Sequence, residues 1–200
     1  MTDTTDHKAK MKERQKEHRK TVSDLQDPEK GLVLVHTGKG KGKSSSAFGV
    51  VIRALGWGHK VGVVQFIKGK WKTGERLFFD KFDTGVTWHT MGDGFTWDTQ
   101  DKDQDTRAAQ AALAKASDMM ASGEYDLIVL DEINIAMRYD YVTVDQMLAA
   151  LDGRDAKTGV VLTGRDAKPE ICDYADLVTE MTEVKHPFKA GIKAQRGVDY

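Results

Sequence analysis

Cysteine is almost absent from this chain of 200 residues, which contains Cys172 alone. A single cysteine excludes an internal disulfide, and no other cysteine or histidine lies near it at the spacing of a structural zinc site. Proteins without disulfides are typical of reducing compartments. The sequence therefore predicts a cytoplasmic localisation.

Long apolar runs are also missing. No stretch approaches the roughly 20 apolar residues that a membrane-spanning helix needs, and the N-terminus lacks the apolar core of a signal peptide. Acidic and basic residues nearly cancel, at a net charge of −1. No strongly basic surface is then available for nonspecific binding to nucleic acid. These absences predict a soluble protein with neither a membrane nor a nucleic acid as partner.

The length suits one domain with a substantial core, preceded by a polar arm. Residues 1–30 are rich in lysine and contain helix-forming residues, but almost no apolar stripe. We expect this arm to be flexible, as a disordered segment or a frayed helix. The alternative is a helix that becomes ordered over a ligand or a partner subunit. Residues 31–200 are expected to form a single α/β domain.

Short apolar runs alternate with helical patterns after residue 30. Strands are predicted at residues 32–35, 61–66, 86–91, 127–130, 160–162 and 177–178. Helices are predicted at residues 45–55, 103–122 and 143–153 and near Pro169, and Thr143 with Gln146 forms a potential capping box. Alternation of this kind is typical of a mostly parallel sheet with helices on both faces.

A loop rich in glycine and lysine follows the first predicted strand and precedes the first helix of this domain. Its residues are Thr37, Gly38, Lys39, Gly40, Lys41, Gly42, Lys43, Ser44 and Ser45. In this context the loop resembles a Walker A motif, in which backbone N–H groups surround phosphates, Lys43 reaches the outer phosphates and Ser44 ligates Mg²⁺. The usual motif begins with glycine where this chain has Thr37. The alternative, a flexible lysine-rich turn, explains less of this context.

A second motif supports the phosphate site. The apolar run at residues 127–130 ends in Asp131 and Glu132, where a Walker B motif would hold Mg²⁺. Either carboxylate is a candidate metal ligand. A surface pair of acidic residues at the end of a strand is the alternative explanation.

Four further segments, at residues 91–97, 163–165, 175–181 and 186–195, follow in order. Together with the lysine-rich loop they resemble the ATP:corrinoid adenosyltransferases of the CobA/BtuR/CobO type, over residues 31–200. The resemblance implies an α/β fold of the P-loop NTPase-like (RecA-like) class. It also implies transfer of the 5′-deoxyadenosyl group of ATP to the cobalt(I) of a corrinoid, with release of tripolyphosphate, in the biosynthesis or salvage of adenosylcobalamin.

The resemblance assigns roles to particular residues. Phe95 and Trp97 match the aromatics that displace the lower cobalt ligand, although core packing is their alternative. Lys43 supplies charge to the leaving triphosphate. Apart from these roles, the charge of Arg165 makes it a candidate contact for phosphate or corrinoid, with a surface salt bridge as its alternative. The implied small molecules are ATP, Mg²⁺ or Mn²⁺ and the corrinoid. A reduced flavoprotein as electron donor, a homodimer and an N-terminal helix over the corrinoid are implied as well.

Two other functions share the same loop. A P-loop ATPase or kinase would act at the γ-phosphate, with Glu132 orienting the water or hydroxyl. A noncatalytic module that binds nucleotide or corrinoid would deliver a cofactor to a partner. The histidines at positions 36, 59, 89 and 186 lack the spacing of metal ligands and are expected to pack or to form hydrogen bonds.

Overall fold

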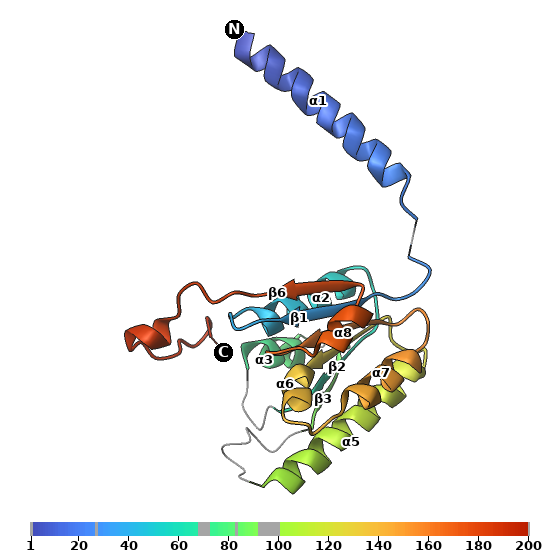
Figure 1. Cartoon of the computed structure of the whole chain (residues 1–200), viewed down its shortest axis with the longest axis vertical. Coiled ribbons are helices and arrows are strands. Elements are labelled where there is room, and N and C mark those ends of the chain that lie inside the picture. The colour runs from blue at the N-terminus through green and yellow to red at the C-terminus, as the bar shows by residue number, and fades with distance from the viewer. Residues whose placement is uncertain (1, 27, 68–72, 83, 92–100, 200) are drawn as a thin grey trace.

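A computed structural model describes residues 2–26, 28–67, 73–82, 84–91 and 101–199, and the side chains from residue 6 onward within these ranges. Phe95 and Trp97 therefore lie outside the described residues. The described chain forms one parallel sheet flanked by helices, with a separate helix at the N-terminus (Figure 1).

Six strands pair in the order β3-β2-β4-β5-β1-β6, and all of the pairs are parallel. Val and Leu dominate the central strands, as expected for strands covered on both faces. At the edge, all four residues of β6 are exposed. The strands are β1 (Val33–Thr37), β2 (Val61–Gln65), β3 (Thr87–Thr90), β4 (Leu127–Asp131), β5 (Gly159–Thr163) and β6 (Leu177–Glu180).

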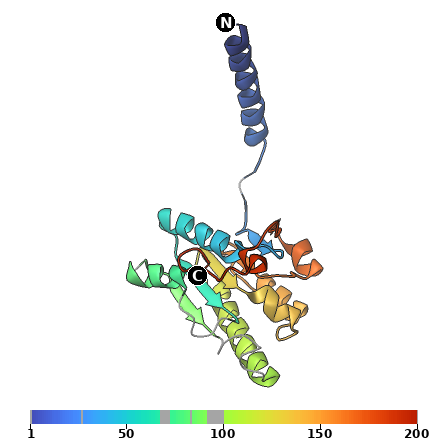
Figure 2. The same cartoon turned by 90° about the vertical axis from the view of Figure 1, so that its left-hand side faces the viewer.

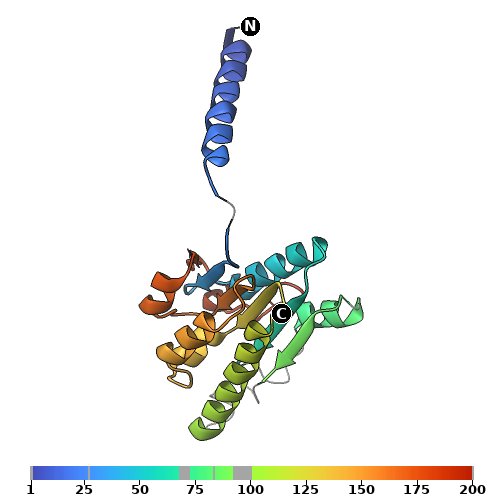
Figure 3. The same cartoon turned by 90° about the vertical axis from the view of Figure 1, so that its right-hand side faces the viewer.

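Helices cover both faces of this sheet (Figure 3). On one face, α2 (Lys43–Gly56) and α3 (Gly74–Lys81) pack on side chains such as Val63 and Val129. The larger core cluster lies on the other face. The helices that contribute to it are α5 (Lys102–Ala121), α6 (Ile133–Arg138), α7 (Val144–Asp152) and α8 (Pro169–Tyr174).

The N-terminal helix α1 (Thr2–Ser23) projects away from the sheet (Figures 1 and 2). Its described side chains are exposed, and its few apolar residues, Met11 and Val22 among them, form no buried face. A long helix without an apolar stripe gains nothing from packing, so its order comes from local propensity. Among the described helices, none is both long and apolar enough to cross a membrane.

The predicted strands are all present, and the alternating order of strands and helices is confirmed. The capping box of Thr143 and Gln146 is also confirmed, with Gly153 ending the helix. The first helix of the domain begins at Lys43, two residues earlier than predicted, because Gly42 takes a left-handed conformation with φ of 108° directly before it. Three short elements were not predicted: α3, α6 and a 3₁₀ helix, Pro187–Ala190. Each is shorter than the window of about 11–18 residues in which helical periodicity is recognised.

Candidate functional site: a phosphate loop at the carboxyl edge of the sheet

The candidate site lies where four neighbouring parallel strands end. Strands β4, β5, β1 and β6 are adjacent in the sheet, so the segments that follow them meet at one edge. The glycine-rich loop follows β1, Glu132 follows β4, Arg165 lies two residues beyond β5, and Met181 follows β6. In open parallel sheets this edge is the usual place for a ligand.

The first half of the loop is held against the end of β6. The Gly40 N–H donates to the Met181 carbonyl at 2.7 Å, and the Met181 N–H donates to the Thr37 carbonyl at 2.8 Å. A Cβ added at Gly38 would lie 2.4 Å from the Met181 oxygen, and Gly38 has a φ of 94°. Glycine is therefore required at position 38 for backbone packing and for its left-handed conformation. The Gly40 N–H already has a partner in Met181, so this donor does not face a phosphate.

Thr37 replaces the first glycine of the usual motif and connects two loops. Its Oγ1 accepts a hydrogen bond from the Ala167 N–H at 3.0 Å. Glycine has no side chain that can accept this bond. The departure from the usual motif thus ties the start of the phosphate loop to the segment between β5 and α8.

Lys43 is the most enclosed cation of the loop. Its side chain lies at the start of α2, and its Nζ donates to the Gly40 carbonyl at 2.5 Å. Burial lowers the pKa of Lys43, and the nearby Glu132 carboxylate opposes that shift. An ammonium group that is partly removed from water is poised to pair with an anion, because its own hydration is incomplete.

The other two lysines of the loop are exposed. Lys41 forms an ion pair at 2.5 Å with Asp199 from the C-terminal segment, and this hydrogen bond holds the pKa of the Asp199 carboxyl below its usual value. Ser44 is half-buried in the first turn of α2, and Ser45 is exposed beside it. Both hydroxyls lie at the helix N-terminus, where the macrodipole favours negative charge.

Asp131, the last residue of β4, is fully buried and held by two side chains. Gln65 Nε2 donates to its Oδ2 at 2.9 Å, and Thr163 Oγ1 donates to its Oδ1 at 2.8 Å. Glu132 follows in a left-handed conformation, with φ of 64°, and is half-buried. Its N–H donates to Thr163 Oγ1 at 2.9 Å.

A magnesium ion fits this donor set. Mg²⁺ prefers hard oxygen ligands and usually takes one or two carboxylates together with substrate phosphates and water. Ser44, Asp131 and Glu132 are oxygen donors from neighbouring segments at one edge of the sheet. The described residues contain no cluster of three or more His, Cys, Asp or Glu side chains that could hold a metal by themselves. The phosphates of a nucleotide would therefore complete the coordination.

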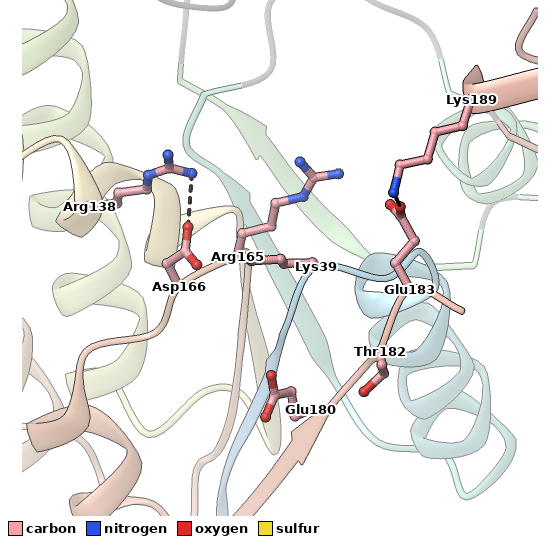
Figure 4. Close-up of a pocket in the computed structure, with 8 residues that line it drawn as sticks. All are labelled: Lys39, Arg138, Arg165, Asp166, Glu180, Thr182, Glu183 and Lys189. Atoms are coloured by element: carbon pink, nitrogen blue, oxygen red, sulfur yellow. Dashed lines mark ion pairs between the residues drawn. The ribbon is translucent and has the colours of Figure 1, made fainter. Parts of the chain in front are cut away.

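A polar cavity of about 550 Å³ opens beside the loop (Figure 4). Four basic and three acidic side chains, with Thr182, line it: Lys39, Arg138, Arg165, Lys189, Asp166, Glu180 and Glu183. Figure 4 shows Arg138 paired with Asp166, at 2.9 Å, and Lys189 paired with Glu183.

Arg165 differs from Arg138 and Lys189, which are both paired with carboxylates in the cavity. Its charge contributes to the lowered pKa of Lys43, so the two cations lie close together. Within the described ranges no carboxylate is placed to form an ion pair with Arg165. The surface salt bridge considered for this residue is thus not formed there, and its guanidinium is available to an anionic ligand.

Two polar residues that support this edge were not predicted to do so from the sequence. Gln65 and Thr163 are buried, and each is the last residue of an otherwise apolar strand. A polar residue at the end of a buried apolar strand was the feature that could have identified them. A buried polar side chain is unfavourable unless it has a hydrogen-bond partner. His36 is buried as expected, with Nδ1 3.4 Å from the Lys43 carbonyl, and burial lowers its pKa.

Comparison with solved structures places this fold. The flagellar accessory protein FlaH from Methanocaldococcus jannaschii superposes with a TM-score of 0.52 at 13% identity, covering 75% of this chain and 70% of that one. With the glycine-rich loop between β1 and α2, the fold is P-loop NTPase-like, as predicted.

Relatives in sequence are far closer. A corrinoid adenosyltransferase of Pseudomonas aeruginosa is 50% identical over 194 residues, which cover 97% of this chain and 95% of the relative. One from Escherichia coli K12 is 45% identical and covers 90% of each chain. Residues 29–200 match the family described as ATP:corrinoid adenosyltransferase BtuR/CobO/CobP. The resemblance seen in the motifs is confirmed, and this chain belongs to the ATP:corrinoid adenosyltransferase family.

Proposed function

We propose that this chain transfers the 5′-deoxyadenosyl group of ATP to the cobalt(I) of a corrinoid in cobalamin biosynthesis. The observation that carries the proposal is the family match over residues 29–200, which includes the phosphate loop and every segment at the carboxyl edge of the sheet. An ATPase or kinase function would use the same loop, but the relatives do not favour it.

The reaction requires charge stabilisation more than acid–base chemistry. The electron pair of cobalt(I) forms a bond to C5′ of the ribose. The bond from C5′ to the phosphate oxygen breaks, and tripolyphosphate leaves with the electron pair of that broken C–O bond. Cobalt(I) is itself the nucleophile, so no protein base has to activate it. The protein has to bind a polyanion and stabilise the negative charge that develops on it.

Residues at the carboxyl edge match that requirement. Lys43 and Lys41 would pair with the phosphates, and Arg165 would contact phosphate or corrinoid. Lys39 and the backbone N–H groups from Thr37 to Ser45, other than that of Gly40, would complete the binding loop. Ser44 together with Asp131 or Glu132 would hold Mg²⁺, or Mn²⁺ in its place, and the ion supplies Lewis-acid stabilisation of the triphosphate when bound.

Phe95 and Trp97 remain a prediction from the sequence. Their proposed role is to displace the lower axial ligand of cobalt(II), because removing that ligand makes reduction to cobalt(I) easier. The segment that contains them connects β3, an edge strand next to β2, with α5. A reduced flavoprotein is the proposed electron donor.

The same family membership suggests the protein's surroundings. We propose a cytoplasmic homodimer, with residues 1–30 as an arm whose helix covers the corrinoid and residues 31–200 as the catalytic domain. The projecting position of α1 supports this division, since the helix is free to meet a ligand or a partner subunit (Figure 1).

The decisive experiment identifies both products. The protein is incubated with ATP, Mg²⁺, a corrinoid and a reductant strong enough to give cobalt(I), and the mixture is separated by liquid chromatography. We expect adenosylated corrinoid and tripolyphosphate in equal amounts, with neither formed when the corrinoid is omitted. Release of orthophosphate without corrinoid would identify an ATPase instead, and tight binding without any product would identify a noncatalytic module.

A further inference from the structure

A row of polar side chains crosses the sheet at its carboxyl edge. Strand register places Gln65 opposite Thr90 of β3 and opposite Asp131 of β4, while His36 of β1 lies opposite Thr163 of β5. The preceding level is apolar in the central strands, with Val64, Leu130, Leu162 and Val35. Residues at one level of a sheet share a face, so polarity is confined to the last level on one side.

This polar row lies on the face that α2 covers. Val63 and Val129, two residues before Gln65 and Asp131, belong to the core cluster packed beneath α2, and side chains two apart share a face. His36 Nδ1 lies 3.4 Å from the carbonyl of Lys43, the first residue of α2. The row therefore lies at the N-terminal end of α2. Gln65 therefore lies on the phosphate-loop side of the sheet, although it belongs to a strand far from the loop in sequence.

The amide of Gln65 is fixed in one orientation. Its Oε1 accepts from Trp88 Nε1 at 3.0 Å and from Thr90 Oγ1 at 3.3 Å, and its Nε2 donates to Asp131 Oδ2 at 2.9 Å. An indole N–H only donates, so Oε1 must face Trp88 and Nε2 must face Asp131. The side chain is only 4% exposed, so a reversed amide would leave buried groups without partners.

Trp88 connects this amide to the helix of the phosphate loop. Its ring stacks on Phe48 of α2, with centroids 5.2 Å apart, and the Arg76 guanidinium lies 5.2 Å from the ring centroid. The chain of contacts runs from α2 through Trp88 and Gln65 to Asp131. On its other side Asp131 is held by Thr163, so both carboxylate oxygens have fixed donors.

We propose that Gln65 is a positioning residue, which sets the orientation of the Asp131 carboxylate toward the metal-bound triphosphate. This inference rests on the proposed function, because it takes Asp131 as part of the Mg²⁺–ATP site. In this role Gln65 acts without contacting ATP or the corrinoid. Its effect reaches the nucleotide through Asp131, since a carboxylate that loses a buried donor gains rotational freedom and loses the geometry that suits the ion.

The test compares Gln65→Met with Thr90→Val by calorimetric titration of ATP in the absence of corrinoid. Methionine keeps the length of the side chain and removes both hydrogen-bonding ends. Thr90→Val removes only the contact at the far end of Gln65 and leaves Asp131 untouched. For Gln65→Met we expect about tenfold weaker binding of ATP with Mg²⁺ and unchanged binding of ATP in EDTA. For Thr90→Val we expect less than a twofold change in both.

Equal losses with Mg²⁺ and in EDTA would overturn the proposal, because they would show a general effect on the loop. A second measurement covers a failure of Gln65→Met to fold. Gln65→Asn keeps the amide but shortens its reach, and in an Asp131→Asn background it should change Mg²⁺–ATP affinity by less than twofold. A full additional loss in that background would show that Gln65 does not act through Asp131.

These titrations also separate the inference from the proposed function. Product analysis of the wild-type protein tests adenosyl transfer by itself. A wild type that makes no adenosylated corrinoid, combined with a Mg²⁺-selective loss in Gln65→Met, would reject the reaction and keep the positioning role. An active wild type, combined with equal losses of ATP affinity with Mg²⁺ and in EDTA for Gln65→Met, would keep the reaction and reject the positioning role.

Discussion

The last level of the sheet and the helix α1 differ in how they are held. At the sheet edge Gln65, Asp131 and Thr163 are buried, and each polar group is fixed by a neighbour from another strand. In α1 the described side chains are exposed and contact solvent. The first region is costly to alter, because every change leaves a buried partner unsatisfied. Substitutions in α1 should change the stability little unless a ligand or a partner covers the helix.

Lys43→Ala should have the largest effect of any change at the sheet edge. The triphosphate loses a partly desolvated charge, so we expect ATP binding to weaken by about 100-fold, in line with a charged hydrogen bond of up to about 3 kcal/mol. Adenosyl transfer should fall at least as far. Lys157→Ala is the matched control, since this exposed lysine lies near the start of β5, away from the loop. Titration of ATP measures both, and equal small losses would contradict the assignment of Lys43.

Gly38→Ala should have the next largest effect. Its Cβ would meet the Met181 carbonyl, and a left-handed conformation costs an alanine about 1–2 kcal/mol. We expect a lower melting temperature and about tenfold weaker ATP binding. Gly49→Ala is the control, because this helical glycine in α2 has nothing within 4 Å of an added Cβ and should gain about 0.5–1 kcal/mol. A neutral Gly38→Ala would show that the loop takes another path.

Deletion of residues 1–25 should leave the folded domain almost unchanged. The helix α1 buries no apolar face, so the free energy of unfolding should change by less than about 0.5 kcal/mol. Corrinoid affinity should weaken several-fold if the arm covers that ligand, while ATP affinity stays unchanged. Thermal unfolding and separate titrations with each substrate measure these quantities. Unchanged corrinoid affinity would reject the covering role.

The pH dependence of stability should give the smallest effect. Burial lowers the pKa of His36 below its ordinary value of 6.5, so the unfolded chain binds a proton more readily than the folded one. The free energy of unfolding should then fall as the pH drops from 6.5 toward the lowered pKa. His36→Asn should show a shallower decline than wild type in denaturant titrations, and a variant of the exposed His59 should not. Identical slopes for all three proteins would contradict this origin.

Much of this architecture was predictable from the sequence, because it depends on local patterns. Apolar runs of two to six residues marked the strands, and the capping residues Thr143 and Gln146 marked a helix start. The phosphate loop was recognisable since its chemistry is contained in nine consecutive residues. The Asp131–Glu132 pair was equally visible at the end of its strand.

The supporting contacts were not predictable, because they join residues far apart in the chain. Gln65 and Asp131 are separated by 66 positions, and Thr37 and Ala167 by 130. Nothing near Gln65 in sequence indicates that its strand lies beside β4, since that pairing depends on the strand order of the whole sheet. The role of Thr37 was hidden for the same reason, and the position first appeared only as a missing glycine.

The ion pair between Lys41 and Asp199 has a practical consequence for handling the protein. It brings the end of the described chain against the phosphate loop, so any peptide added beyond that point starts within reach of the nucleotide. An affinity tag at that end would lie beside the phosphate loop and would interfere with nucleotide binding. A cleavable tag ahead of α1 would begin well away from the phosphate loop, because α1 projects from the domain (Figure 2). Such a tag would leave the phosphate site accessible.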